Sequence, residues 1–264
     1  MVAVPTTKPA KPGLAIKVVD LVRPLVLLAA FLFVEHHHGF IWAAPLAFGT
    51  FLAASVLVHD LIHNALDLPL RFNDVCLSFY SLFLIKSGHA LRRLHLEHHA
   101  RCLEDDDREG NVIYIATWKL LLTGPFLALQ ARWLSWKSEK RRRWAQLLES
   151  VVNVALTLGF VYAIVVLHSN AAALYFATVV FMTVTVPIAG AKVPHLLPEK
   201  APRLVRALRP WTSRLTPAAS SLLFHELHHR RPKIPAAQLA ENQGLLETTN
   251  ESNCAKHYAE HAGD

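Results

Sequence analysis

The chain has 264 residues, enough for one or two domains, and 53% of them are hydrophobic while only 18% are charged. A mean hydropathy of +0.28 is high for a soluble protein and indicates long apolar blocks. The net charge of +7 leaves nucleic acid, an anionic membrane face or an acidic partner open until the charges are placed. Three cysteines without CxxC spacing exclude a cysteine-based zinc framework.

Four apolar blocks follow a Pro- and Lys-rich lead, residues 1–17, which we expect to be a disordered cytoplasmic tail. The blocks that we predict to cross a membrane are residues 18–34, 39–58, 150–167 and 171–190. At about 1.5 Å per residue, an uncharged block of this length spans about 30 Å, the thickness of a bilayer core. The first block carries Asp20 and Arg23 near its start, where the headgroups would lie. A buried helix of a soluble protein is the alternative for any one block, but it is a poor explanation for four.

Two short turns pair the predicted spans into hairpins. Only EHHHG at 35–39 separates the first two spans, and only HSN at 168–170 separates the last two. All 27 lysines and arginines lie outside these turns, so the positive-inside rule places the tails and the central region on the cytoplasmic side. The sequence therefore predicts an all-α integral membrane protein of four transmembrane helices with a cytoplasmic helical cap. Its basic charge follows from this topology, and no nucleic-acid partner is needed.

Two further apolar segments lie in the central region. Residues 75–85 are too few to cross a bilayer. Residues 112–136 are interrupted by Lys119 and contain three tryptophans, which is typical of a helix lying in the membrane interface. Both segments are candidates to line the entry of an apolar substrate. We expect one membrane domain over residues 18–240 and a C-terminal tail over 241–264.

Three clusters of histidine punctuate this pattern: HDLIH at 59–63, HLEHH at 95–99 and HELHH at 225–229. Residues at i, i+3 and i+4 share one face of a helix, so each cluster points its imidazoles one way. The predicted topology places all three clusters on one side of the bilayer. A further histidine, His195, stands just past the end of the fourth predicted span. The predicted metal ligands are His59, His63, His95, His98, His99, His195, His225, His228 and His229.

Nine imidazoles exceed what one ion can coordinate, so we expect two metal ions. Imidazole binds iron, zinc, copper and nickel, and the spacing alone does not separate iron from zinc. Isolated histidines are usually structural, but three clusters at ligand spacing are not. We treat His36–His38, His257 and His261 as incidental, and we expect His89 to be structural or to lie behind the ligands.

In their order and spacing, the three clusters resemble the histidine boxes of the membrane fatty acid desaturase superfamily, and the likeness covers roughly residues 20–240. The segment FHELHHRRPKIPAAQL is similar to the third box of acyl desaturases. The short length, VPHLLPE before the third box and EDDDRE after the second are similar to bacterial carotenoid ketolases and hydroxylases. One departure is Ala191, where some acyl desaturases have an Asn linked to water-mediated coordination.

The resemblance implies a pair of iron ions that uses O2 and two electrons to oxidise unactivated C–H bonds of a membrane lipid. A fatty acyl chain is the first expectation for the substrate, and a carotenoid is the alternative. Electrons would come from a separate ferredoxin-like or cytochrome donor, for which the basic run KSEKRRRW at 137–144 is a candidate docking site. The implied location is the bacterial inner membrane, with the metals on the cytoplasmic side.

Four carboxylates near the ligands are candidates to orient imidazole N–H groups: Asp60, Glu97, Asp107 and Glu226. For Asp107, a place in a solvated loop is the alternative. HELHH also fits the HExxH pattern of a zinc peptidase with Glu226 as base, but that interpretation leaves two histidine clusters unused. A non-catalytic metal transporter is a third possibility, which predicts ionisable groups inside the spans rather than beyond them.

Overall fold

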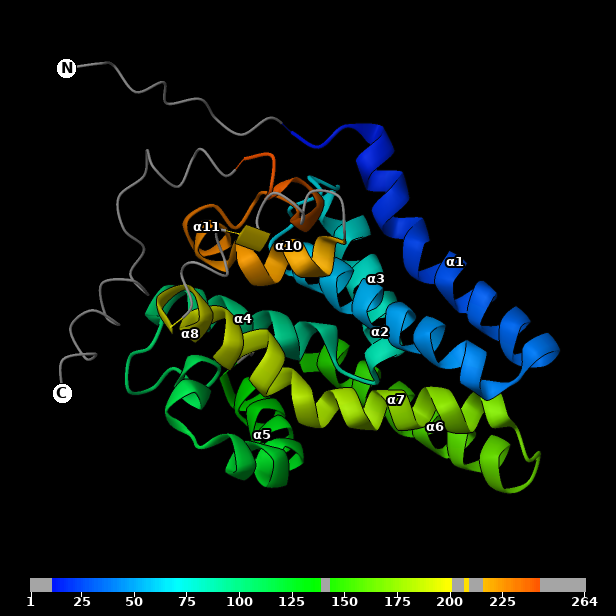
Figure 1. The fold of residues 1–264 in the computed structure, drawn as a ribbon. Helices are drawn as coiled ribbons and strands as arrows, with labels where there is room; N and C mark the ends of the chain where they lie inside the picture. Colours follow the sequence, from blue (N-terminus) through cyan, green and yellow to red (C-terminus); the bar gives the residue numbers. More distant parts are fainter. Residues whose placement is uncertain (1–10, 139–142, 201–206, 209–215, 243–264) are drawn as a thin grey trace, which may run out of the picture.

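The structure is a computed structural model that describes residues 11–138, 143–200, 207–208 and 216–242. Within these residues all regular secondary structure is helical, as Figure 1 shows. The prediction of an all-α fold is therefore confirmed for the described part of the chain.

The first hairpin consists of α1 (Leu14–His38) and α2 (Phe40–Ile62). Gly39 joins them with a φ of 83°, a left-handed conformation that glycine adopts without strain. Helix α1 begins before residue 18, the predicted start, so the last residues of the expected disordered tail are helical. Residues 1–10 of that tail lie outside the described part.

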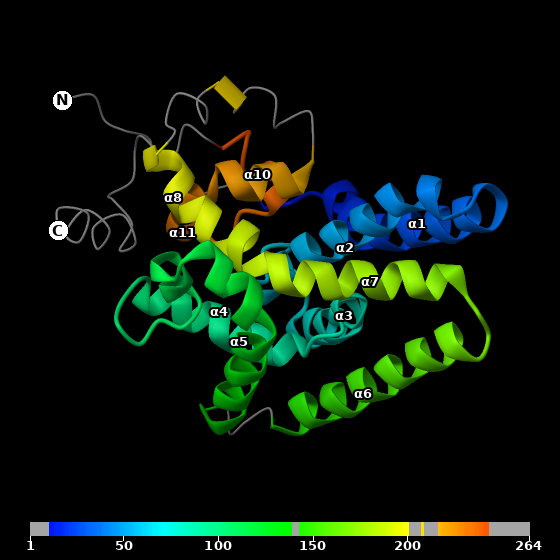
Figure 2. The ribbon, with the colours of Figure 1, turned by 60° about the horizontal axis from the view of Figure 1, so that its bottom comes forward.

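The second hairpin consists of α6 (Arg143–Val165) and α7 (Asn170–Val186). The Ser169 side chain caps α7 by accepting a hydrogen bond from the Ala172 N–H at 3.2 Å. Figures 1 and 2 show both hairpin turns at the same end of the molecule, away from α4, α8 and α11. This arrangement agrees with the predicted pairing of the apolar blocks.

Three helical stretches are long and apolar enough to cross a membrane: Phe40–Ile62, Arg143–Val165 and Asn170–Leu196. They correspond to the second, third and fourth predicted spans. Helix α1 is long but is not among them, since Lys17, Asp20, Arg23 and Glu35 interrupt its apolar sequence. The first span and the sidedness of the chain therefore stay predictions.

Between the hairpins lie α3 (Leu70–Ser81), η1 (Leu82–Leu84), α4 (Gly88–Arg101), η2 (Gly110–Tyr114) and α5 (Thr117–Ser138). The short apolar segment 75–85 forms the end of α3 together with η1. Most of 112–136 forms α5, where Trp118, Phe126 and Trp133 are exposed. Exposed aromatic residues are expected for a helix in a membrane interface.

After α7 the chain continues without a break into a π-helical segment, η3 (Pro187–Lys192), and then into α8 (Val193–Lys200). The C-terminal part contains α10 (Pro217–Leu223), α11 (His225–Arg230) and η4 (Ala236–Gln238). Its buried cluster includes Phe224, Leu227 and Ile234. Phe224 separates α10 from α11, so a nearly inaccessible ring anchors the third histidine cluster.

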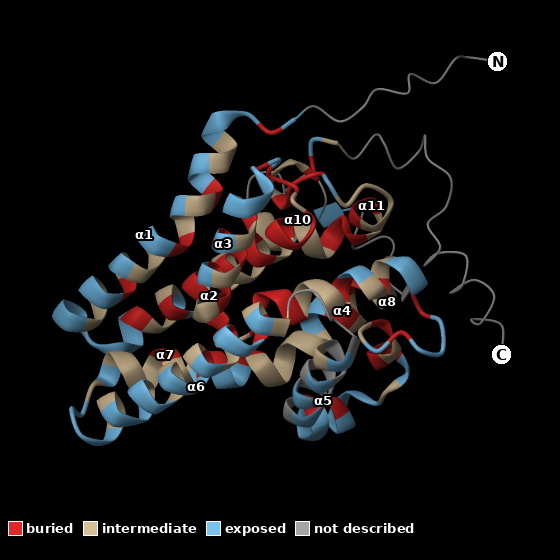
Figure 3. Cartoon of the chain, turned by 180° about the vertical axis from the view of Figure 1, so that it is seen from behind, coloured by how far each residue is buried: buried red, intermediate tan, exposed pale blue. Residues whose placement is uncertain are grey.

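Burial is uneven across the molecule. Figure 3 shows exposed residues along α1 and the α6–α7 hairpin, whereas buried residues gather around α2, α10 and α11. The main core joins α2 and α3 to the inner sides of α1 and α7, with Phe31, Phe51 and Leu77 almost inaccessible. Apolar exposure on the hairpins is what a helix facing lipid would show.

Candidate metal centre

Four parts of the chain bring their histidines to one place. The end of α2 supplies His59 and its C-cap His63, and α8 supplies His195. Helix α4 supplies His95, His98 and His99, and α11 supplies His225, His228 and His229. The structure therefore brings together all nine histidines that the sequence predicts as ligands, although up to 170 residues separate them along the chain.

The imidazoles form two groups in which the candidate ligand atoms lie within 4.8 Å of one another. The first group is His59, His63, His95 and His228, and the second is His98, His195, His225 and His229. His99 adjoins the first group, because its Nε2 lies 3.1 Å from His95 Nε2 and 3.0 Å from His228 Nε2. Two groups agree with the expectation of two ions rather than one.

The distances between ring nitrogens are those that a shared cation imposes. In the second group, His225 Nε2 lies 3.1 Å from both His195 Nε2 and His229 Nε2, and His195 Nε2 lies 3.3 Å from His98 Nε2. Two nitrogens bound about 2.1 Å from an ion lie about 3.0 Å apart at a right angle and about 3.4 Å apart at a tetrahedral angle. The residues present therefore fit a metal ion in each group.

Two further observations support that fit. His63 Nε2 is buried and accepts or donates no hydrogen bond among the described residues. In neutral His95 and His98, Nδ1 donates to a carboxylate, so Nε2 turns a lone pair toward the other imidazoles. Lone pairs that converge repel each other unless a cation lies between them.

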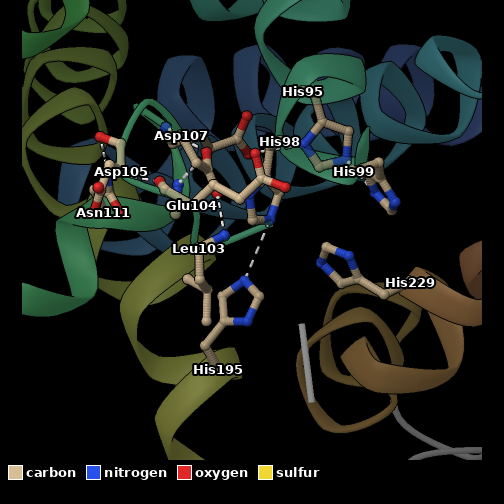
Figure 4. A network of polar contacts seen from close by, with 12 residues as sticks. His95, His98, His99, Leu103, Glu104, Asp105, Asp107, Asn111, His195 and His229 are labelled. Carbon is tan, nitrogen blue, oxygen red and sulfur yellow. Dashed lines mark hydrogen bonds and ion pairs between the residues drawn. The ribbon is translucent and has the colours of Figure 1, made fainter. Parts of the chain in front are cut away.

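The carboxylate partners come from one loop. His98 Nδ1 lies 2.7 Å from Asp107 Oδ2, and His95 Nδ1 lies 2.7 Å from Glu109 Oε1. Figure 4 shows His98 between Asp107 on one side and His195 on the other. Such partners fix the tautomer and orientation of a ligating imidazole and raise its basicity.

Asp107 is itself held in place by the backbone. It is almost fully buried and accepts hydrogen bonds from the Leu103 N–H at 2.7 Å and the Gly110 N–H at 2.9 Å. A Cβ on Gly110 would stand 2.2 Å from Asp107 Oδ2, so glycine is what lets the loop close on this carboxylate. The solvated-loop alternative for Asp107 is therefore wrong.

The charges on these groups follow from burial and pairing. Burial lowers the pKa of His95, His225 and His228 well below the ordinary value, and neighbouring imidazoles lower it further. Burial also disfavours the charged forms of His98 and Asp107. The hydrogen bond between these two side chains outweighs that effect, so it raises the pKa of His98 and lowers the pKa of Asp107. The imidazoles whose pKa is lowered stay neutral at neutral pH, and a neutral imidazole can bind a cation.

The other predicted carboxylates do not orient imidazoles, which corrects the expectation from sequence. Asp60 is buried and accepts from the Ala236 N–H at 3.1 Å, so it ties the C-terminal segment to the end of α2. Glu97 lies 3.8 Å from Arg93 on its own helix, and Glu226 pairs with Arg230. Glu109 was missed; its only signal was its place in the acidic run that holds Asp107.

His195 depends on the π-helical segment before it. Pro187 has no N–H to donate, and the chain passes through η3 (Pro187–Lys192) before α8 begins. A π-helical stretch changes the direction in which later residues of a helix point, and such stretches are frequent at functional sites. The same continuous helix thus serves as a candidate span and as a carrier of a candidate ligand.

The remaining predicted features lie apart from the cluster. His36–His38 close α1 at the opposite end of the molecule (Figure 1). Residues 139–142 of the basic run 137–144 lie outside the described residues, as do His257 and His261. His89 belongs to α4, but it pairs with Glu149 of α6 rather than with the other imidazoles.

Comparison with known proteins adds one finding to this geometry. A family model described as "Fatty acid desaturase" matches residues 36–262, most of the chain. A search of curated proteins and one of solved structures give no match. The family match, the three helices that could cross a membrane and the histidine groups together indicate a membrane-bound oxidoreductase with a site able to hold metal.

The chain belongs to the fatty acid desaturase family.

Proposed function

We propose that this protein is a di-iron enzyme that desaturates a fatty acyl chain of a membrane lipid in the presence of O2. The observation that carries the proposal is the convergence of nine imidazoles in two adjacent groups. Family membership makes the reaction an oxidation. Zinc has no redox chemistry, so an oxidation by O2 needs a redox-active ion, and iron is the one we propose.

The reaction removes one hydrogen atom from each of two neighbouring carbons and forms a double bond between them. The two hydrogen atoms, together with two electrons from a donor and two protons from water, reduce O2 to two water molecules. The iron pair supplies the oxidising power that no side chain has. The residues of the chain hold that pair: Asp107 and Glu109 fix the ring orientation of His98 and His95.

Substrate approach follows from the position of the cluster. The candidate span α2 ends beside His59 and His63, and the span over Asn170–Leu196 ends beside His195. With both hairpins in the bilayer, the metals would lie just beyond the cytoplasmic surface. An acyl chain could then enter from the membrane while its polar head stays in water. Four spans, including α1, and a cytoplasmic cap belong to this proposal.

The electron donor is a separate protein in this proposal, either a ferredoxin or a cytochrome. The basic run 137–144 would attract an acidic donor, and positive charge next to a membrane span also suits the cytoplasmic surface. Lower ionic strength should therefore speed electron delivery.

The peptidase alternative finds no support in the geometry. A zinc peptidase needs Glu226 as a base facing the ion, but its carboxylate pairs with Arg230. His225 and His229 would serve as the two histidine ligands of the motif. They share their group with His98 and His195, and a four-coordinate zinc held by all four imidazoles would have no position left for water and substrate.

The test is expression of the full chain in a bacterial host, followed by lipid extraction and mass spectrometry. We expect acyl chains 2 Da lighter, with a double bond at one position, and about two irons in each purified chain. His228→Ala should remove both signals. If the mass change appears instead as +14 or +16 Da on supplied carotenoids, the substrate assignment is wrong and the ketolase or hydroxylase alternative holds. Zinc in the place of iron would overturn the reaction itself.

A further inference from the structure

A second polar site lies on a different face of α4 from the metal cluster. Its centre is the buried Glu149 carboxylate of α6. Glu149 Oε1 accepts from the Ser78 hydroxyl at 2.6 Å and lies 2.7 Å from His89 Nδ1. Oε2 accepts from the Ser87 hydroxyl at 2.5 Å and from the His89 N–H at 3.3 Å. With 100° of rotation per residue, His89 lies about 120° around α4 from His95.

The hydrogen bonds at Glu149 define the protonation of His89. The Ser87 hydroxyl already accepts from the Ala90 N–H at 3.2 Å, so its own hydrogen goes to Glu149. The carboxylate is thus an acceptor for every neighbour, and His89 Nδ1 must be a donor. In the neutral ring, Nε2 is then an acceptor. No hydrogen bond to His89 Nε2 is found among the described residues.

His89 and Glu149 line a groove of about 610 Å³ between α3 and α6. Its apolar walls are Val75, Phe79 and Leu82 of the α3 region and Trp144, Leu148 and Val152 of α6. That volume is within the range of ligand pockets, roughly 300–1,000 Å³. Figure 2 shows α6 diverging from α7 toward the N-terminal end of α6.

The groove is placed to receive a lipid from the bilayer. Helix α6 is a candidate span, and only 11% of its apolar 18-residue stretch is buried in the protein. Leu148 on the groove wall is 66% exposed. A ligand entering from the hydrocarbon region would meet apolar side chains first and the His89–Glu149 pair at the end. The buried carboxylate would repel an anionic head. A neutral head with a hydrogen to donate would satisfy His89 Nε2.

We propose that the α3–α6 groove binds a long-chain lipid through a neutral hydroxyl head, which donates its hydrogen to Nε2 of His89. The site is separate from the metal cluster, so binding does not depend on the proposed desaturation and should persist in metal-free protein. Glu149 acts as a positioning residue by holding His89 in the tautomer that accepts a hydrogen bond.

The test uses the full chain in lipid nanodiscs at pH 8. The probe is a photoreactive sixteen-carbon alcohol, and peptide mapping locates its crosslinks. Unlabelled hexadecanol, hexadecane and hexadecanoate compete for the site. We expect crosslinks on α3 and α6, and an advantage of hexadecanol over hexadecane of about five- to tenfold, the effect of one neutral hydrogen bond. Equal competition by the alcohol and the alkane would overturn the proposal.

Two variants test the tautomer. His89→Phe should retain crosslinking but lose the preference for alcohol. In Glu149→Gln, the Ser87 hydroxyl and the His89 N–H still donate to the position of Oε2, so the amide oxygen should take that place. The amide NH2 should then face His89 Nδ1. His89 would then carry its hydrogen on Nε2, and the preference should change from the alcohol to a matched methyl ketone. A purely structural role for Glu149 predicts no such change.

A matched pair of bulky substitutions tests the location. Val152→Trp adds volume to the groove wall and should reduce crosslinking at least tenfold. Val154→Trp places the same side chain at an exposed position of the same helix and should have little effect. Loss of crosslinking in both variants, or in neither, would show that the alcohol binds elsewhere. Iron content and elution volume of each variant verify that it is folded.

Discussion

Helix α4 carries histidines hydrogen-bonded to carboxylates on two of its faces. His95 and His98 on one face, and His89 on another, each hold a carboxylate oxygen 2.7 Å from Nδ1. What differs is the surroundings of the other ring nitrogen. At His95 and His98 it meets further imidazoles, whereas His89 borders an apolar groove. A carboxylate–histidine pair therefore fixes a ring, and the neighbouring elements decide whether that ring serves a metal or something else.

The source of the carboxylate also differs between the two faces. Asp107 and Glu109 lie in the loop that follows α4, so the metal-facing pairs form within one segment of 15 residues. Glu149 comes from α6, 60 residues away from His89. The first arrangement can assemble locally, while the second ties α4 to the second hairpin. Disturbing either pair should accordingly give a different defect.

The largest contrast is expected between His98→Ala and His89→Phe. His98→Ala removes a ring from the second group and should lower iron content and abolish turnover, by at least a thousandfold. His89→Phe should retain about two irons per chain, because the ring lies on another face of α4. Metal analysis of both purified proteins is the measurement. Equal iron loss in the two variants would mean that the two faces are not independent.

Next in size is the effect of the carboxylate behind His98. Asp107→Asn keeps the size of the side chain but removes the charge that orients the ring, which typically weakens metal affinity 10–100-fold. Glu109→Gln should have a smaller effect, because the Glu109 side chain is 33% exposed. Iron binding in competition with a chelator gives the ratio. Asp106→Asn is the matched control, since Asp106 is exposed and pairs with Arg101; a loss as large as that of Asp107→Asn would contradict the assignment.

The stability of the metal-free protein should depend on pH, and the lowered and raised pKa values in the cluster act on it in opposite directions. The pKa values of His95, His225 and His228 are lowered, so below about pH 6.5 the unfolded chain binds protons that the folded chain does not. Stability should fall with acid, by at most about 1.4 kcal/mol per pH unit for each group.

His98 acts in the opposite direction. Its raised pKa stabilises the fold fully below about pH 6.5, and this contribution is lost as the pH rises through the folded-state pKa. Eight of the nine histidines in the cluster have a lowered pKa and only His98 has a raised one, so the net effect is a loss of stability in acid. Thermal unfolding of metal-free protein between pH 5 and 8 measures it, and His228→Asn should flatten the slope. Stability that increases toward acid pH would show that the imidazoles are hydrated and that burial does not lower their pKa.

The sequence predicted the ligands better than it predicted what holds them. Helical spacing at i, i+3 and i+4 predicted eight of the nine histidines that the structure brings together, and the ninth, His195, was predicted from its place just past the fourth span. The predicted third span starts at residue 150, one residue after Glu149. The helix instead begins at Arg143, and Ser78, Ser87 and His89 satisfy the buried carboxylate. No local pattern contains those contacts.

The smallest expected effects come from adding one methyl group at three glycines. Gly110→Ala would displace Asp107 and should weaken iron binding several-fold. Gly88→Ala would place a Cβ 2.8 Å from the Leu77 carbonyl oxygen of α3, so it should lower stability by about 1–3 kcal/mol without the same loss of iron affinity.

Gly159 of α6 has no atom within 4 Å of the added Cβ, and Gly159→Ala should raise helix stability by about 1 kcal/mol or less. Unfolding midpoints and iron affinities of the three variants, measured together, give the comparison. The two faces of α4 are independent if Gly110→Ala lowers iron affinity more than stability and Gly88→Ala lowers stability more than iron affinity. If iron affinity falls in proportion to stability in both variants, the loop at Gly110 and the helix contact at Gly88 form one cooperative unit. The two faces of α4 are then not independent.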